Sequence, residues 1–173
     1  MPYPCDDFMK DVDAELFRGV TIHAEQQIIF QWLCQMRIAP YSYDWIDNFG
    51  RKSPDKLTPG LDVLEIGQDV MTIFKLIDFK PDSYLTIRIK EKILGHQIAA
   101  DAVITYIIHP KKQSRCRLLV KLLVIYPKGI LGFLNRLILP VGDLIMMRRQ
   151  LFNFKRLSEK TPPQTPAYPD TAP

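Results

Sequence analysis

The sequence predicts a single α+β domain in which a curved antiparallel sheet wraps around a long C-terminal helix. Three observations support this prediction: two short helical patterns follow the first strand, several alternating segments follow one another through the middle of the chain, and the longest helical pattern comes last. The chain has 173 residues, which suits one domain because domains usually contain about 100–200 residues. We therefore expect one core between sheet and helix.

The first part of the chain predicts a strand and two short helices. Residues 13–23 include a run of β-branched side chains, which favour strands. Residues 24–36 change to apolar spacings of three and four, the pattern of one buried helix face. Pro40 ends this helix, and three aromatic residues at intervals of four in residues 41–49 predict another. Residues 51–68 form a long loop with two prolines and two glycines, and loops of this length are often functional.

The middle of the chain predicts four antiparallel strands, over residues 69–79, 84–90, 102–109 and 115–126. The second of these strands shows the clearest alternation, since apolar residues from Leu85 onwards alternate with Thr86, Arg88 and Lys90. Clean alternation is typical of antiparallel sheets with one face on a core and the other in water.

Residues 129–157 carry the longest helical pattern, and Pro140 should kink or divide this helix. One apolar stripe runs along it at spacings of three and four, and the following residues carry it: Ile130, Phe133, Leu137, Val141, Leu144, Met147, Leu151 and Phe154. Further apolar residues make the stripe wider than that of an ordinary surface helix. A sheet curved around such a helix leaves space between them, so we expect an internal apolar cavity.

The two ends are expected to lie outside the domain. Residues 1–12 predict a flexible N-terminus, residues 13–157 a single domain, and residues 158–173 a disordered proline-rich tail. The tail has almost no large apolar residues, so it cannot bury enough surface to offset the entropy of ordering it.

Composition excludes several classes of function. The 23 basic and 19 acidic residues leave a net charge of +4, too mild to indicate nucleic-acid binding. No stretch approaches the roughly 20 consecutive apolar residues of a transmembrane helix. Cys5, Cys34 and Cys116 fit neither a disulfide framework nor a zinc site. Their number and spacing favour a reduced, cytoplasmic compartment.

Three short motifs suggest a family. Residues 39–48 read APYSYDWIDN, residues 57–61 read LTPGL, and residues 139–148 read LPVGDLIMMR. Together with the order of elements, these motifs resemble the START-like, helix-grip superfamily, also called SRPBCC, and in particular a bacterial branch labelled polyketide cyclase-like. The resemblance implies a cavity that binds a ligand, but many unrelated functions share this fold.

The strongest candidates for ligand contact are Tyr41, Tyr43 and Trp45. Tyrosine and tryptophan combine apolar area with a polar tip, which suits the mouth of a pocket. The alternative is that this segment simply packs on the sheet, and the spacing of Tyr41 and Trp45 favours the core for those two. Asn48, beside two aspartates, is a possible anchor for a ligand, although such residues more often cap helices or lie at the surface.

Polar residues within the predicted strands are further candidates for ligand contact. Asp78, Arg88 and Thr105 would face either the cavity or solvent, because the sequence does not fix the strand register. No histidine, cysteine or carboxylate spacing predicts a metal site, and no catalytic triad or phosphate loop predicts a cofactor.

The leading hypothesis is the binding or carriage of a small hydrophobic molecule in the cavity. The resemblance also permits a polyketide cyclase or aromatase, in which the cavity would chiefly hold a reactive chain in a folded shape. A third alternative is a protein-interaction module with a filled core.

Overall fold

The computed structural model describes residues 3–47, 50–93, 96–97, 100–112 and 115–162. Its strands are β1 (Ala14–Ile22), β2 (Asp69–Val70), β3 (Phe74–Lys80), β4 (Tyr84–Ile89), β5 (Lys92–Ile93), β6 (His96–Gln97), β7 (Asp101–Lys111) and β8 (Arg115–Ile125). Its helices are η1 (Pro4–Asp7), α1 (Gln26–Cys34), η2 (Gln35–Arg37), α2 (Asp44–Asp47) and α3 (Ile130–Lys160).

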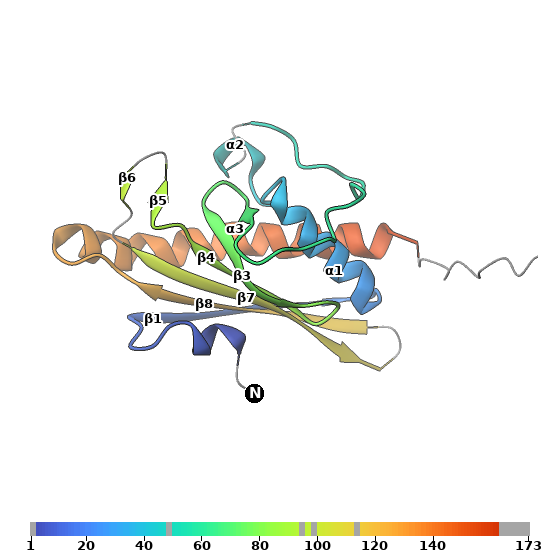
Figure 1. Ribbon diagram of the computed structural model, residues 1–173, viewed down its shortest axis with the longest axis horizontal. Helices are drawn as coiled ribbons and strands as arrows, with labels where there is room; N and C mark the ends of the chain where they lie inside the picture. The colour runs from blue at the N-terminus through green and yellow to red at the C-terminus, as the bar shows by residue number, and fades with distance from the viewer. Residues whose placement is uncertain (1–2, 48–49, 94–95, 98–99, 113–114, 163–173) are drawn as a thin grey trace, which may run out of the picture.

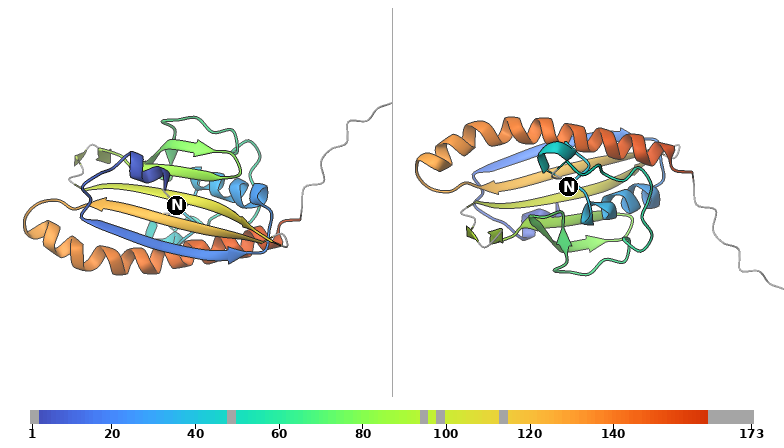
Figure 2. Two further views of the ribbon diagram at one scale, coloured as in Figure 1. Left: turned by 90° about the horizontal axis from the view of Figure 1, so that it is seen from below. Right: turned by 90° about the horizontal axis from the view of Figure 1, so that it is seen from above.

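Six antiparallel strands form one sheet in the order β1-β8-β7-β4-β3-β2, while β5 and β6 make a separate pair. Figure 1 shows α1 and α3 on one side of the curved sheet and the N-terminal segment on the other. The views in Figure 2 show α3 running along the sheet beside β1. The predicted arrangement of a curved sheet around a long final helix is therefore confirmed.

The core lies between the concave face of the sheet and the helices. Met147, Leu151, Phe154 and Leu157 project from one face of α3 into this core, where they meet α1 and the inward side chains of the strands. Pro140 does not end α3, which continues as one helix to Lys160. The domain therefore extends beyond residue 157, and Trp32 Nε1 donates a 2.9 Å hydrogen bond to Thr161 Oγ1 just after the helix.

The first half of α3 departs from the predicted stripe. Leu144 was expected in the core, but 48% of it is exposed, and Val141 is also exposed. Periodicity identifies the apolar face of a helix but not the length over which a sheet covers it. Among the residues of this half whose burial is described, the exposed apolar ones are Ile138, Val141, Leu144 and Ile145.

The N-terminal segment covers the convex face of the sheet. Cys5 and Met9 are buried against Val103 and Leu123, in a second apolar cluster separate from the main core. Lys121 Nζ lies 2.6 Å from Asp6 Oδ1 and adds an ion pair to this contact. Cys5 and Met9, which lie within the segment expected to be flexible, are thus packed against the sheet.

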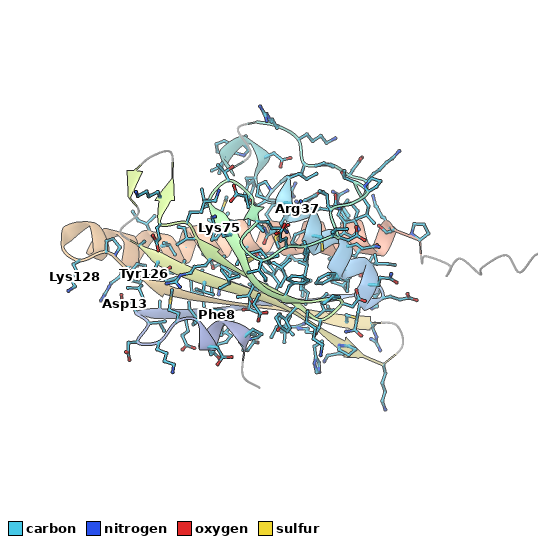
Figure 3. The ribbon with its side chains drawn as sticks, viewed as in Figure 1. Phe8, Asp13, Arg37, Lys75, Tyr126 and Lys128 are labelled. Atoms are coloured by element: carbon cyan, nitrogen blue, oxygen red, sulfur yellow. The ribbon has the colours of Figure 1, made fainter. Side chains whose placement is uncertain are left out.

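Asp13 connects three elements where the sheet passes into α3. Its carboxylate accepts hydrogen bonds from the backbone N–H of Tyr126, at 2.9 Å, and from Arg136, at 2.6 Å. Figure 3 shows Asp13, Tyr126 and Lys128 close to this end of the molecule. This contact fixes the start of β1 against the start of α3.

Candidate functional site

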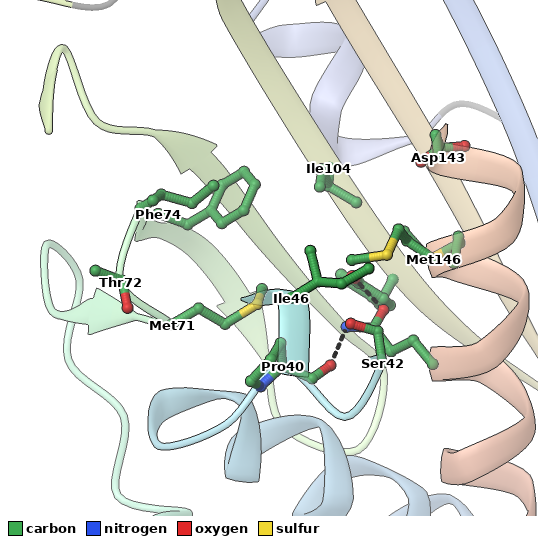
Figure 4. A pocket seen from close by; sticks show the side chains of 13 residues that line it. Pro40, Ser42, Ile46, Met71, Thr72, Phe74, Ile104, Asp143 and Met146 are labelled. Atoms are coloured by element: carbon green, nitrogen blue, oxygen red, sulfur yellow. Dashed lines mark hydrogen bonds between the residues drawn. The ribbon is translucent and has the colours of Figure 1, made fainter. Parts of the chain in front are cut away.

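An apolar pocket of about 390 Å³ lies between the concave face of the sheet and α3. Figure 4 shows side chains from the segment before α2, the β2–β3 turn, β7 and α3 converging on it. Its apolar lining comes mainly from Pro40, Ile46, Met71, Ile73, Phe74, Ile104, Met146 and Met147. The volume falls within the usual range for small-molecule sites, roughly 300–1,000 Å³.

Three of the lining residues are methionines. Met71 enters from the β2–β3 turn, and Met146 and Met147 enter from α3. Methionine side chains are unbranched and polarizable, so they adapt to ligands of different shape. The lining is therefore suited to apolar ligands of several shapes and not to one shape alone.

A hydrogen-bonded chain closes one part of the pocket. Tyr106 on β7 donates a 2.8 Å hydrogen bond to Gln150 Oε1 on α3, and Gln150 Nε2 donates a 2.6 Å bond to the carbonyl of Pro40. Both side chains are buried. Burial raises the pKa of Tyr106 well above its usual value, so its hydroxyl remains a donor at neutral pH. These groups satisfy one another and hold the sheet, helix and loop together.

Asp143 supplies a carboxylate to the pocket lining. Arg18 Nη2 on β1 lies 3.0 Å from Asp143 Oδ2. Asp143 Oδ2 and Arg18 Nε are nevertheless buried without a hydrogen-bond partner among the described residues. Burial raises the pKa of Asp143 above its ordinary value, and the Arg18 charge opposes that rise. The ion pair with Arg18 thus holds a charged carboxyl group at the edge of an otherwise apolar pocket.

The three predicted aromatic residues lie in three different environments, and none of them lines this pocket. Tyr41 is only 1% exposed and packs edge-on against Trp32, whereas Trp45 is 75% exposed. The expectation that both would be core is thus wrong for Trp45, because α2 covers only one turn and leaves this side exposed. Tyr43 is half-buried near Arg149. Asn48 lies outside the described residues.

The three predicted strand residues lie on the convex face, away from the pocket. Thr105 is fully buried, and its hydroxyl is 2.9 Å from that of Thr86. Arg88 pairs with Asp101, and Asp78 accepts a 3.0 Å hydrogen bond from the Tyr84 hydroxyl. The register pairs Asp78 with Thr86 and Thr86 with Thr105, which places all three side chains on one face. These residues support the sheet and do not contact the cavity.

Two polar residues of the pocket were missed. Asp143 and Gln150 are seven positions apart on α3, so they share a helix face with the buried Met147. A signal was present in the sequence, because polar residues stood at helical spacing inside an apolar stripe. No sequence pattern predicted that the β2–β3 turn would line the pocket, because residues 69–79 have the composition of one continuous strand.

The described residues contain no group of three or more histidine, cysteine or acidic side chains placed to hold a metal ion. Within that same part of the chain, no helix is both long and apolar enough to cross a membrane.

The structure resembles several solved structures at low sequence identity. A hypothetical protein from Helicobacter pylori matches with a TM-score of 0.57 and 13% identity, over 91% of this chain and 95% of its own. The Zhui aromatase/cyclase from Streptomyces matches with a TM-score of 0.54 and 11% identity, over 85% of this chain and 94% of its own. The chain has a START-like, helix-grip fold.

A crystal structure of a protein from Chromobacterium violaceum matches with a TM-score of 0.52 and 11% identity, over 85% of this chain and 98% of its own. No protein-family model matches the sequence, and no curated protein is significantly similar to it. At these identities the similarity defines the helix-grip fold, and function must be argued from the site.

Proposed function

We propose that the protein binds a small, mainly apolar molecule in the pocket between the sheet and α3. The observation that carries this proposal is the pocket itself, about 390 Å³ of space lined by methionine, isoleucine and phenylalanine side chains. The pocket supports ligand binding over the alternative of a protein-interaction module with a filled core. Removing apolar ligand surface from water supplies the binding energy, at roughly 25 cal/mol per Å².

The Asp143–Arg18 pair supports a ligand with one polar end. Asp143 lines a pocket that is otherwise largely apolar, and its carboxyl group is paired with Arg18 through Oδ2. A hydroxyl, phenol or amine placed there would donate to the carboxylate. The preferred ligand is therefore an amphipathic molecule whose donor group meets Asp143 while its apolar body meets the methionines.

A cyclase-type enzyme is the second candidate, supported by Asp143 and by the fold shared with an aromatase/cyclase. Burial raises the pKa of Asp143, which is the direction that a carboxyl group acting as a general acid requires. The pocket would then position the reactive chain, and Asp143 would act as the acid. Asp143 would contact the ligand in both the carrier and the enzyme. A binding experiment therefore cannot distinguish the two functions, whereas conversion of the bound molecule to a product would identify the enzyme.

An environment-sensitive apolar dye tests the proposed binding. We expect a saturable fluorescence increase with one dye per protein, and competition by the small molecules that native mass spectrometry finds bound after purification. Tyr43→Ala should leave dye binding unchanged, because Tyr43 does not line the pocket. Unsaturable binding, or none, would reject the proposal.

A further inference from the structure

A second hollow, of about 340 Å³, lies between the C-terminal half of α3 and the loop that follows α2. It shares only Ser42 with the apolar pocket, and its lining is of a different kind. Three basic side chains lie around it, since Lys52 comes from the loop and Arg149 and Arg156 come from α3. We call this hollow the basic cleft.

Within the part of the chain that the structure describes, the cations of the basic cleft have no acidic partner. Among the described residues, Lys52, Arg149 and Arg156 form no ion pair, although many other charged side chains of the protein do. Arg149 lies over the Tyr43 ring, 5.9 Å from its centroid, which orients the guanidinium without neutralising it.

The carboxylates of the cleft do not cancel this charge. Asp44 accepts hydrogen bonds from the backbone N–H and the hydroxyl of Ser53, at 2.8 and 2.5 Å, so both of its oxygens are already used. Asp55 is exposed at the edge. Three cations against two carboxylates leave the lining of the cleft with a surplus of one positive charge.

A buried hydroxyl provides an independent indication of a missing partner. Tyr41 lines the cleft and is 1% exposed, yet its hydroxyl has no hydrogen-bond partner among the described residues. Its backbone has φ +58°, a conformation that is unusual for a non-glycine residue, and Asn153 Nδ2 donates 2.8 Å to its carbonyl. Residues held in such conformations are concentrated at ligand sites.

The hydroxyl of Tyr41 is suited to donate to an anion. Burial, with a smaller contribution from Asp44, raises the pKa of Tyr41 far above its usual value, so the hydroxyl keeps its proton at neutral pH. A buried donor without an acceptor costs free energy, and an oxyanion in the cleft would remove that cost.

We propose that the basic cleft binds a phosphate-type oxyanion, held by Arg149, Arg156 and Lys52 and by a hydrogen bond from the Tyr41 hydroxyl. Arginine matches phosphate oxygens with two parallel N–H donors, and charge-assisted bonds of this kind are about twice as strong as neutral ones. The cleft is larger than a phosphate group alone, which leaves room for the organic part of a phosphorylated molecule.

Calorimetric titration of the full chain at low salt tests the proposal, with inorganic phosphate and a soluble alkyl phosphate as probes. Arg149→Gln and Arg156→Gln should each weaken binding at least about tenfold. Arg148→Gln is the matched control, because Arg148 is on the same helix but does not line the cleft, and should leave affinity unchanged. Tyr41→Phe should weaken phosphate binding while leaving the stability of the free protein intact, since its hydroxyl has no bond to lose.

Vesicles of phosphatidylglycerol with phosphatidylcholine distinguish a soluble phosphate from a lipid headgroup. Binding to either source supports the cleft when it is lost in Arg149→Gln and Arg156→Gln and retained in Arg148→Gln. Equal loss in all three variants would show charge attraction without a site and would overturn the proposal, as would no binding to either probe. The apolar dye should bind normally in all these variants, so failure here is distinct from failure of the apolar pocket.

Discussion

The Tyr106 hydroxyl of β7 donates a 2.8 Å hydrogen bond to Gln150 Oε1 of α3, and so ties the sheet to the long helix beside the apolar pocket. The bond lies among buried groups, where losing one partner costs more than the bond itself contributes. The walls of the pocket are therefore held in place by a polar contact as well as by packing.

Tyr106→Phe should lower the free energy of unfolding by about 1–3 kcal/mol, because Gln150 Oε1 would be left buried without its donor. Urea denaturation followed by circular dichroism measures the change. Tyr41→Phe is the matched control, since Tyr41 is equally buried but its hydroxyl has no partner. Equal destabilisation by both changes would contradict the bond.

The stability of the Asp143→Asn variant, relative to that of the natural protein, should increase as the pH rises above 3.8, the ordinary pKa of aspartate. The raised pKa of Asp143 means that the folded protein holds this proton more tightly than the unfolded chain. The contribution of Asp143 to stability therefore falls as pH rises through its folded pKa. Urea midpoints measured between pH 4 and 8 test this difference.

Asp69→Asn provides a control of opposite sign. A hydrogen bond from Lys90 lowers the pKa of Asp69, so its contribution to stability is lost as pH falls below 3.8. Below pH 3.8 the Asp69 variant should thus lose stability relative to the natural protein as pH rises, so the urea midpoints of this control are measured from about pH 2 to pH 4. The same trend in both variants would show a general effect of charge.

Leu151→Ala should cost about 2–5 kcal/mol of unfolding free energy, as expected for a buried leucine. Leu151 is 5% exposed in the core, whereas Leu144, seven positions earlier on the same helix, is 48% exposed. Leu144→Ala should cost less than about 1 kcal/mol. Chemical denaturation of both variants would show whether the sheet covers only the second half of α3.

Met146→Trp should reduce affinity for the apolar dye at least about tenfold, equivalent to about 1.4 kcal/mol, because the indole would occupy the pocket. Ile145→Trp is the control, since Ile145 is the neighbouring residue of α3 but is exposed and does not line the pocket. Fluorescence titration measures both. Unchanged dye binding in Met146→Trp would place the dye elsewhere.

Met9→Ala should lower stability by about 2–5 kcal/mol, because Met9 is buried on the convex face of the sheet. Phe8→Ala should have a much smaller effect, since the adjacent Phe8 is largely exposed. Thermal denaturation compares the two. A neutral Met9 variant would show that the N-terminal segment adds little to the fold.

The sequence predicted the elements better than their contacts. Alternation in β8 and helical spacing in α1 and α3 placed these elements correctly, because each pattern reflects one buried face. The bulge between Leu76 and Asp78 shifts the register of β3, and no residue pattern in this strand predicts the bulge. The sequence alone therefore did not predict which face of the sheet carries Asp78, Arg88 and Thr105, because this depends on the strand pairing.

The N-terminal segment explains a second failure. Thr86 and Thr105 are polar, so alternation assigned Thr86 to a solvent-facing side, yet both are fully buried. The segment before β1 packs on this face of the sheet, and its sparse apolar side chains, which include Tyr3, Cys5, Phe8, Met9 and Val12, show no period. Tertiary contacts of such segments follow from shape and leave no periodic pattern in the sequence.

The pairing of β1 with β8 has a consequence for how the chain reaches its native state. Ala14 pairs with Val124 and Ile22 with Cys116, so the first strand made by the ribosome meets its partner only after most of the domain has emerged. Pairings this distant along the chain slow folding, because loop closure must come before the contacts that reward it. During that delay β1 exposes an unpaired edge, and the nascent chain is most vulnerable to aggregation before β8 arrives.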